Sequence, residues 1–283
     1  MNTNEVRRNR VHLPGLGMET RVLESGSGPP VVFLHGNPDN ADEWLAAIAL
    51  LSDRYRCIAP DLPGYGEAPE PPKSFDYGVA AQVAFLDAVL AAVGVSEKLI
   101  LVVHDIGGAM GVAWAGANLS RVRGMVITNT VAFEGFHWFA LARMWGDSSL
   151  RGKLRASAGM FAIGLGGGKL FKKIFGKQNP DLSAQQLDRF AKSFAFSRAA
   201  KNTSLRQFPV MTKPDFFAGY DRLLANLTAA VPCRVLWGAR DQYISRDYAE
   251  RFAPAEITVL EDQGHWIALT APGALAREIA QIP

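Results

Sequence analysis

Cysteine is scarce in this 283-residue chain, which has only two, and no uncharged apolar run of about 18 residues occurs in it. Cys57 and Cys233 each lie in or beside a predicted strand, so we interpret them as small buried hydrophobic residues. Their number and spacing give neither a disulfide framework nor a metal site. The N-terminal segment is polar and lacks the apolar stretch of a signal peptide. We therefore expect no transmembrane span and a cytoplasmic location.

Neither sign of charge dominates the chain as a whole. It has 30 Lys and Arg against 27 Asp and Glu, a formal net charge of +3. This balance gives no indication of a nucleic-acid partner. With 48% hydrophobic residues, a chain of this length can bury one large core. We expect a monomer or a homodimer.

Strand and helix patterns alternate over most of the chain. Short apolar runs predict strands at 31–34, 57–59, 99–103, 124–128, 234–237 and 257–260, and helices are predicted at 44–51, 79–93, near 248–252 and from 271. Such alternation is typical of a mostly parallel twisted sheet with helices on both faces. Between residues 131 and 230 it gives way to helices and loops. We therefore predict an α/β core of residues 1–130 and 231–283 with a helical cap of 131–230 inserted in it.

One predicted strand ends at an aspartate, in a pattern that usually contains a serine. The predicted strand 99–103 breaks into His-Asp-Ile-Gly-Gly at 104–108, and a helix rich in small residues follows. A strand, a sharp turn and a helix form the nucleophile elbow, usually written G-x-S-x-G. Here Asp105 replaces the serine and Val103 replaces the first small residue. An aspartate attacks saturated carbon and becomes the acyl group of an alkyl ester. By itself, Asp105 could equally be a helix N-cap.

An acid and a histidine follow at the ends of later strands. Asp241 follows the predicted strand 234–237, and His265 follows 257–260. The order nucleophile, acid, histidine is that of the elbow-containing hydrolases. Asp241 would orient the imidazole, and His265 would take a proton from the water that hydrolyses the ester on Asp105. Asp247 and Asp262 are alternatives for the acid.

Backbone N–H groups near Asp105 should stabilise the oxyanion that forms during hydrolysis. The two candidates are the N–H of Ile106 and that of Asn37, in the His35–Pro38 loop after the first predicted strand.

These motifs resemble the aspartate-nucleophile branch of the α/β-hydrolases, which contains epoxide hydrolases and haloalkane dehalogenases. The matching segments are HGNP at 35–38 with Trp44, APDLPGYG at 59–66, HDIGG at 104–108, WGARD at 237–241 and GHW at 264–266. The resemblance covers residues ~20–130 and ~230–283 and is weak over the cap. It implies an α/β-hydrolase fold with a helical cap, no cofactor, no metal, and catalysis by Asp105, Asp241 and His265.

Haloalkane dehalogenases and epoxide hydrolases need different residues to assist the leaving group, and this sequence matches each only in part. A halide needs N–H donors, and the tryptophan that dehalogenases place after the nucleophile is Ile106 here. Asn37 matches their second donor, and Trp138 or Trp145 could supply another. An epoxide needs a proton donor, which Tyr220 in the cap would provide, with His137 in place of the usual second tyrosine. Because the donor beside the nucleophile is missing, the sequence slightly favours an epoxide hydrolase over a haloalkane dehalogenase.

Other functions remain open. His137, Trp138 and Tyr220 resemble a fluoride pocket of fluoroacetate dehalogenases, but the arginines that hold the carboxylate there are absent from 106–110. A β-lactone-acting relative and a catalytically silent binding protein are further alternatives. A serine esterase is not, because the serine is missing.

The predicted cap is strongly basic. From Arg143 to Lys213 it has 14 Lys and Arg against three Asp and Glu, a net charge of +11, which leaves −8 for the rest of the chain. One interpretation is a weak contact with a membrane surface that delivers apolar substrates. The other is a solvated cap whose lysine stems cover apolar surface. Gly164 and Gly166–Gly168 indicate a flexible entrance. The expected substrates are a small apolar organic molecule and water.

Overall fold

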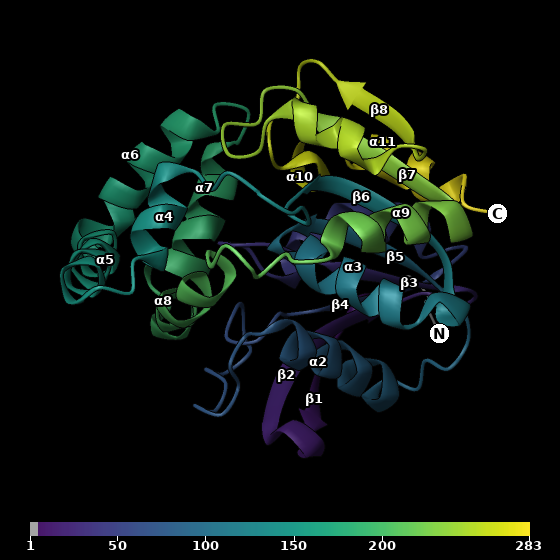
Figure 1. Ribbon diagram of the computed structural model, residues 1–283, viewed down its shortest axis with the longest axis horizontal. Coiled ribbons are helices and arrows are strands. Elements are labelled where there is room, and N and C mark those ends of the chain that lie inside the picture. The colour runs from purple at the N-terminus through teal and green to yellow at the C-terminus, as the bar shows by residue number, and fades with distance from the viewer. Residues whose placement is uncertain (1–4) are drawn as a thin grey trace.

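An eight-stranded sheet organises the computed structural model, which describes residues 5–283 (Figure 1). The strands are β1 Arg7–Leu13, β2 Met18–Ser25, β3 Pro30–Leu34, β4 Arg56–Pro60, β5 Leu99–Asp105, β6 Val122–Thr130, β7 Cys233–Gly238 and β8 Glu256–Leu260. Their order in the sheet is β1-β2-β4-β3-β5-β6-β7-β8. β1, β2 and β4 pair antiparallel, and all pairs from β4 to β8 are parallel. The predicted α/β fold is therefore confirmed.

All six strands predicted from the sequence are present, and the N-terminal hairpin of β1 and β2 was missed. β1 is mostly exposed and has the sequence RRNRVHL, which has no apolar run. In β2, the buried positions include Thr20, Arg21 and Glu24. Arg21 is matched by Asp61, with its Nε 2.8 Å from Oδ2. Because several buried residues of β2 are polar and have polar partners, β2 has no hydrophobic run by which it could be predicted.

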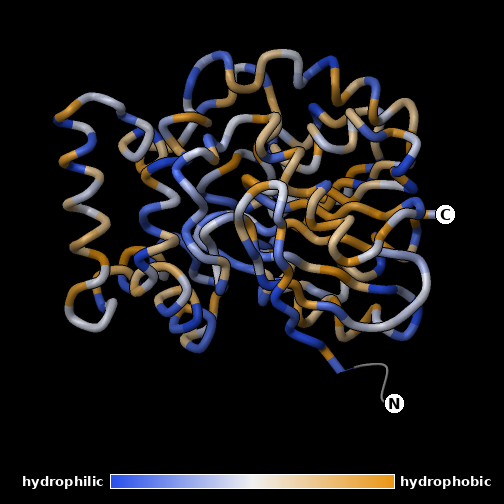
Figure 2. Tube along the Cα trace, turned by 90° about the horizontal axis from the view of Figure 1, so that it is seen from below, coloured by the Kyte–Doolittle hydropathy of each residue, from blue (hydrophilic) through white to orange (hydrophobic). Residues whose placement is uncertain are grey.

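Helices cover both faces of the sheet. The side chains of β3 alternate between two apolar clusters, with Val32 and Leu34 on one face and Val31 and Phe33 on the other. The first cluster is covered by α2 Val79–Ala92, α3 Ile106–Ala117 and α9 Tyr220–Ala230, and the second by α1 Leu45–Leu51, α10 Ile267–Thr270 and α11 Pro272–Ala280. Figure 2 shows the hydrophobic segments gathered in the sheet region. Burial on both faces explains why the central strands are continuously apolar.

The inserted segment between β6 and β7 forms a separate helical layer at one end of the molecule (Figure 1). It contains α4 Ala140–Gly146, α5 Leu150–Ala162, α6 Lys169–Gln178, α7 Ala184–Phe190 and α8 Arg198–Met211, with the short turns η4 Leu165–Gly168 and η5 Ala191–Ala195. We call residues 140–211 the cap layer. The last helix of the predicted cap, α9, packs against α3 instead. The predicted boundary at residue 230 thus encloses one helix that contacts the core.

The remaining short helices are η1 Pro14–Leu16, η2 Ala41–Trp44, η3 Leu119–Arg121 and η6 Arg246–Phe252. Cys57 and Cys233 are buried and unpaired. Among residues 5–283, no helix has the length and apolar character that crossing a bilayer requires.

Candidate active site

Asp105 ends β5 and begins α3 in a strained backbone conformation. Its φ and ψ are 48° and −128°, a region that residues with a side chain rarely adopt. The side chain of Asp105 lines an apolar cavity. Backbone strain of this kind persists at functional sites, where the surrounding structure imposes it. The conformation expected for a nucleophile elbow is therefore present at Asp105.

Small residues around the elbow are required by close packing. A Cβ on Gly108 would overlap the Thr130 hydroxyl, and one on Gly111 would overlap the Val103 side chain. The Thr130 hydroxyl also donates a hydrogen bond to the Asp105 carbonyl. These contacts hold the start of α3 tightly against β6, so the backbone at Asp105 cannot move to an unstrained conformation.

The loop after β3 provides a hydrogen bond to the Asp105 carboxylate. The Asn37 backbone N–H donates to Asp105 Oδ2 at 2.8 Å. His35 shapes this loop, since its Nε2 accepts from the Leu62 N–H at 2.8 Å and its Nδ1 lies 2.8 Å from the Gly36 carbonyl. Burial lowers the pKa of His35, which agrees with a neutral imidazole accepting at Nε2. The predicted position of the Asn37 N–H beside the nucleophile is thus observed.

Asp241 and His265 form a hydrogen-bonded pair at the carboxyl ends of β7 and β8. His265 Nδ1 lies 2.7 Å from Asp241 Oδ2. The other Asp241 oxygen accepts from the backbone N–H groups of Tyr243 (2.7 Å) and Ile244 (3.0 Å), and the Asn129 amide donates to Oδ2 at 2.7 Å. These donors match an ionised carboxylate that fixes the imidazole. Neither Asp247 nor Asp262 has a hydrogen bond to His265.

A second buried pair lies directly behind His265. His104 Nδ1 is 2.7 Å from Glu43 Oε1, and both side chains are 1% exposed. His104 Nε2 is 3.0 Å from the backbone carbonyl of His265, and the two imidazole centroids are 4.4 Å apart. Acceptor oxygens lie near both ring nitrogens, which favours the protonated imidazole of His104. Burial alone would lower the pKa of His104, but the Glu43 carboxylate raises it to about 9.

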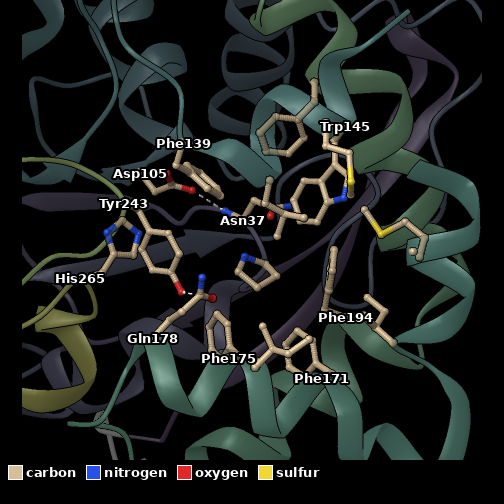
Figure 3. Close-up of a pocket in the computed structure, with 18 of the residues that line it drawn as sticks. Asn37, Asp105, Phe139, Trp145, Phe171, Phe175, Gln178, Phe194, Tyr243 and His265 are labelled. Atoms are coloured by element: carbon tan, nitrogen blue, oxygen red, sulfur yellow. Dashed lines mark hydrogen bonds between the residues drawn. The ribbon is translucent and has the colours of Figure 1, made fainter. Parts of the chain in front are cut away.

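The cavity beside Asp105 has a volume of about 270 Å³ and is almost wholly apolar. Asp105 and His265 lie at one end of it, and Trp145 and Phe194 at the other (Figure 3). The predicted substrate-binding residue Trp138 lines the cavity, as does Ile106. The wall is completed largely by aromatic and aliphatic side chains of α4, α5 and α6. This cavity fits an apolar organic molecule.

Two residues expected at the substrate lie elsewhere. The Tyr220 hydroxyl donates to the Ala109 carbonyl at 2.9 Å, and its side chain is buried against α3 outside the cavity. Burial raises the pKa of Tyr220. His137 lies on the surface, where its Nδ1 is 3.5 Å from the Tyr248 hydroxyl. The physical reason is that Tyr220 begins α9, which packs on α3, and that His137 is exposed to solvent while its neighbour Trp138 is buried at the cavity.

The tyrosine that does line the cavity is Tyr243, which was not predicted from the sequence. Its ring centroid is 5.1 Å from that of His265. Its hydroxyl accepts from the Asn179 amide at 2.7 Å and lies 3.4 Å from Gln178 Oε1. Figure 3 shows this hydroxyl turned toward Gln178 and away from the Asp105 carboxylate. Tyr243 is two residues after Asp241, in a loop that was already assigned to the site, and this position could have predicted it.

The Asn37 side chain is not free to hold a halide. Its Nδ2 donates to the Tyr65 hydroxyl at 2.9 Å and to Ser204 Oγ at 2.7 Å. Those oxygens donate in turn to Gln207 Oε1 and to the Ala200 carbonyl, so they must accept from Asn37. By contrast, the indole N–H groups of Trp138 and Trp145 have no hydrogen-bond partner in the described part of the chain.

Polar contacts fix one side of the cap layer onto the core. Arg189 forms a bidentate pair with buried Asp39 at 2.6 and 2.7 Å. Asn179 accepts from the Trp266 indole N–H at 3.0 Å while it donates to Tyr243, so it joins both neighbours of His265. α7 and the C-terminal end of α6 are therefore anchored to the core beside the site.

Comparison with known proteins agrees with this architecture. A family model described as the alpha/beta hydrolase fold matches residues 29–272. The chain belongs to the α/β-hydrolase fold family. Among solved structures, this α/β-hydrolase is similar to a putative lipase from Acinetobacter baumannii AYE (TM-score 0.78, 19% identity, 99% of this chain and 91% of the other). It is also similar to a haloalkane dehalogenase from Bradyrhizobium elkani USDA94 (TM-score 0.76, 22% identity, 98% and 96%).

Curated relatives cover nearly the whole α/β-hydrolase chain. A cis-3-alkyl-4-alkyloxetan-2-one decarboxylase from Xanthomonas campestris pv. campestris is 28% identical over 275 residues, 90% of this chain and 88% of that protein. A haloalkane dehalogenase from Sphingobium indicum is 25% identical over 276 residues, 93% and 91% of the two chains. The protein is thus an α/β-hydrolase related to haloalkane dehalogenases.

Proposed function

We propose that this protein hydrolyses apolar haloalkanes through an alkyl ester on Asp105. The observation that carries the proposal is the Asp105 carboxylate itself, held on a strained elbow at one end of an apolar cavity, with Asn37 N–H on one oxygen. The Asp241–His265 pair at the same end supplies a base for the second step.

In the first step, the free oxygen of Asp105 attacks the carbon that bears the halogen. A carbon–oxygen bond forms, the carbon–halogen bond breaks, and halide leaves with the bonding pair. Asp105 is already ionised, so no base is needed. The dry cavity strengthens the interaction of the departing anion with any N–H it meets.

In the second step, water attacks the ester carbonyl of Asp105 while His265 Nε2 takes its proton. Asp241 stabilises the imidazolium that results. The backbone N–H groups of Asn37 and Ile106 stabilise the oxyanion. Collapse returns a proton to the departing alkoxide, and the products are an alcohol, halide and one proton.

The leaving group decides between the haloalkane and the epoxide. An epoxide opens to an alkoxide, which needs a proton from an acid. Tyr220 donates to a backbone carbonyl away from the cavity, and the Tyr243 hydroxyl is engaged by Asn179 and Gln178. A halide needs only N–H donors, and Trp138, whose indole N–H has no hydrogen-bond partner among the described residues, lines the cavity. We therefore favour a haloalkane over an epoxide as substrate, whereas the sequence slightly favoured an epoxide.

A second candidate is a β-lactone. Two observations support it: Ile106 has no side-chain N–H donor, and the Asn37 amide already donates to Tyr65 and Ser204. When a β-lactone ring opens, the leaving carboxylate stays attached to the substrate. It therefore needs no set of N–H donors like the one that binds a halide. The full-length similarity to the oxetanone decarboxylase points the same way. After attack of Asp105 at the ring carbon bearing oxygen, loss of CO2 forms the alkene and expels the Asp105 carboxylate. This route consumes no water and does not need His265.

The test supplies 1-bromoalkanes of four to ten carbons and a cis-3,4-dialkyloxetan-2-one to the same preparation. We expect halide and alcohol in equal amounts from the bromoalkanes, and no turnover by Asp105→Ala. Alkene and CO2 from the oxetanone, without halide release from any bromoalkane, would replace the first candidate by the second. Activity retained by Asp105→Ala would contradict both, since each needs the covalent bond.

A further inference from the structure

Exposed apolar residues are concentrated on the outer side of the cap layer. Of the eight large hydrophobic residues that are exposed in the described chain, seven lie between residues 150 and 196. They are Leu150, Leu154, Phe161, Leu165, Leu170, Ile174 and Phe196. Leu150 and Phe161 are 76% and 69% exposed. Since single exposed hydrophobic residues are common but clusters are not, this concentration indicates a contact surface.

The spacing of these residues places them in rows along two helices. On α5, positions 150, 154 and 161 are four and seven residues apart and share one side. On α6, Leu170 and Ile174 are one turn apart, while Phe171 and Phe175, the next residue along in each case, are buried. We call the exposed sides of α5, η4 and α6 the α5–α6 face. It lies at the end of the molecule formed by the cap layer (Figure 1).

Unpaired lysines border the apolar row of α6. Lys169, Lys173 and Lys177 follow each other at four-residue spacing, directly before Leu170 and Ile174 and after Gly176. None of the three forms a salt bridge with another described residue, whereas Lys172 on the inner side pairs with Asp188 at 2.7 Å. The surrounding segment 143–213 has a net charge of +11. The face therefore combines apolar area with uncompensated positive charge.

The cavity reaches this same face. Leu170 and Ile174 line the cavity and are 44% and 47% exposed, so they belong both to its wall and to the surface. Half-buried Ala162 and Ile163, at the end of α5, also line it. Between the two helices, Gly166, Gly167 and Gly168 adopt positive φ values. Two residues of the exposed apolar set thus also form part of the cavity wall.

We propose that the α5–α6 face docks on an anionic lipid bilayer and that apolar substrate passes from the lipid into the cavity. Lysine ammonium groups would contact the lipid headgroups while their stems and the apolar rows enter the interface. A second copy of this chain is a poorer occupant, because it would bring two strongly positive surfaces together. The delivery of substrate rests on the proposed function, but the docking does not.

The docking is tested with purified protein and sedimented vesicles, without any substrate. The cap variant is Lys169→Glu, Lys173→Glu, Lys177→Glu, and the matched control is Lys98→Glu, Arg222→Glu, Arg277→Glu, on exposed core positions with the same change of charge. We expect binding to phosphatidylcholine vesicles with 30% phosphatidylglycerol, and weak binding to phosphatidylcholine alone. Loss of three lysines near the surface, each worth about fivefold, should weaken the cap variant at least ~100-fold. The control should lose much less.

Apolar insertion is tested separately by Leu154→Ser, Phe161→Ser, whose positions do not line the cavity. This variant should also bind the anionic vesicles more weakly while its turnover of a water-dissolved bromoalkane is unchanged. Equal loss in the cap variant and the core control would mean a charge effect of the whole protein and would overturn the proposal. So would absent binding, or a dimer in sedimentation velocity that the same variant abolishes. None of these outcomes bears on halide release, so a failure here is distinct from a failure of the proposed function.

Discussion

Replacing Glu43 by glutamine removes the counter-ion of a buried cation while it keeps the shape of the side chain. In the native protein, His104 Nδ1 lies 2.7 Å from Glu43 and His104 Nε2 lies 3.0 Å from the His265 carbonyl. Without the carboxylate, the buried imidazolium has no compensating charge. His104 should then lose its proton, because burial disfavours the charged form.

The size and the pH range of the effect follow from the pKa of His104. Its value is about 9 in the folded protein, against 6.5 for an unperturbed histidine. At about 1.4 kcal/mol per unit, this difference stabilises the fold by roughly 3 kcal/mol. Because the folded pKa is the higher one, the stabilisation is complete below pH 6.5 and disappears as the pH rises through 9. Breaking a buried pair by removal of one partner typically costs a similar ~3–5 kcal/mol.

Urea unfolding followed by tryptophan fluorescence at pH 6.5, 7.5, 8.5 and 9.5 measures this difference. Glu43→Gln should be less stable than wild type by about 3 kcal/mol at pH 6.5, and the two proteins should converge near pH 9.5. The control Glu19→Gln removes an acid that pairs with exposed Arg10 and should change stability by less than about 1 kcal/mol. A difference between Glu43→Gln and wild type that stays constant over this pH range would refute a charged His104.

Three further changes test the assigned roles. His265→Gln should still release one equivalent of halide from a bromoalkane but retain the alkyl group, which mass spectrometry detects as a protein shifted by the alkyl mass; multiple turnovers would contradict its role as base. Trp138→Phe keeps an aromatic ring but removes the N–H, so kcat for bromoalkanes should fall by about 10²-fold, with little effect on an oxetanone. Tyr220→Phe should leave kcat/KM nearly unchanged and cost about 1 kcal/mol in urea unfolding, because only its bond to a backbone carbonyl is lost; a large loss of epoxide ring opening would restore it as an acid.

The elbow and the order of the candidate catalytic residues were readable from the sequence because they depend on local structure. A buried parallel strand is continuously apolar, and the residue that ends it must lie at the edge where the other strands of the sheet also end. Asp105 ends one such strand, Asp241 follows another, and His265 follows the half-buried edge strand β8, so their convergence needs only the sheet order. The Asn37 N–H beside Asp105 follows from the same geometry.

The cap residues could not be placed in this way. Helical periodicity in the segment between β6 and β7 indicates helices but not how they pack. The resemblance to known families placed Tyr220 and His137 at the substrate, whereas in the structure both lie outside the cavity. Tyr243 lines that cavity, although it belongs to a core loop. Spacing along one chain determines which residues share a strand end or a helix face. Only the packing of the cap layer on the core, through contacts such as Arg189 with Asp39, decides which side chains meet the substrate.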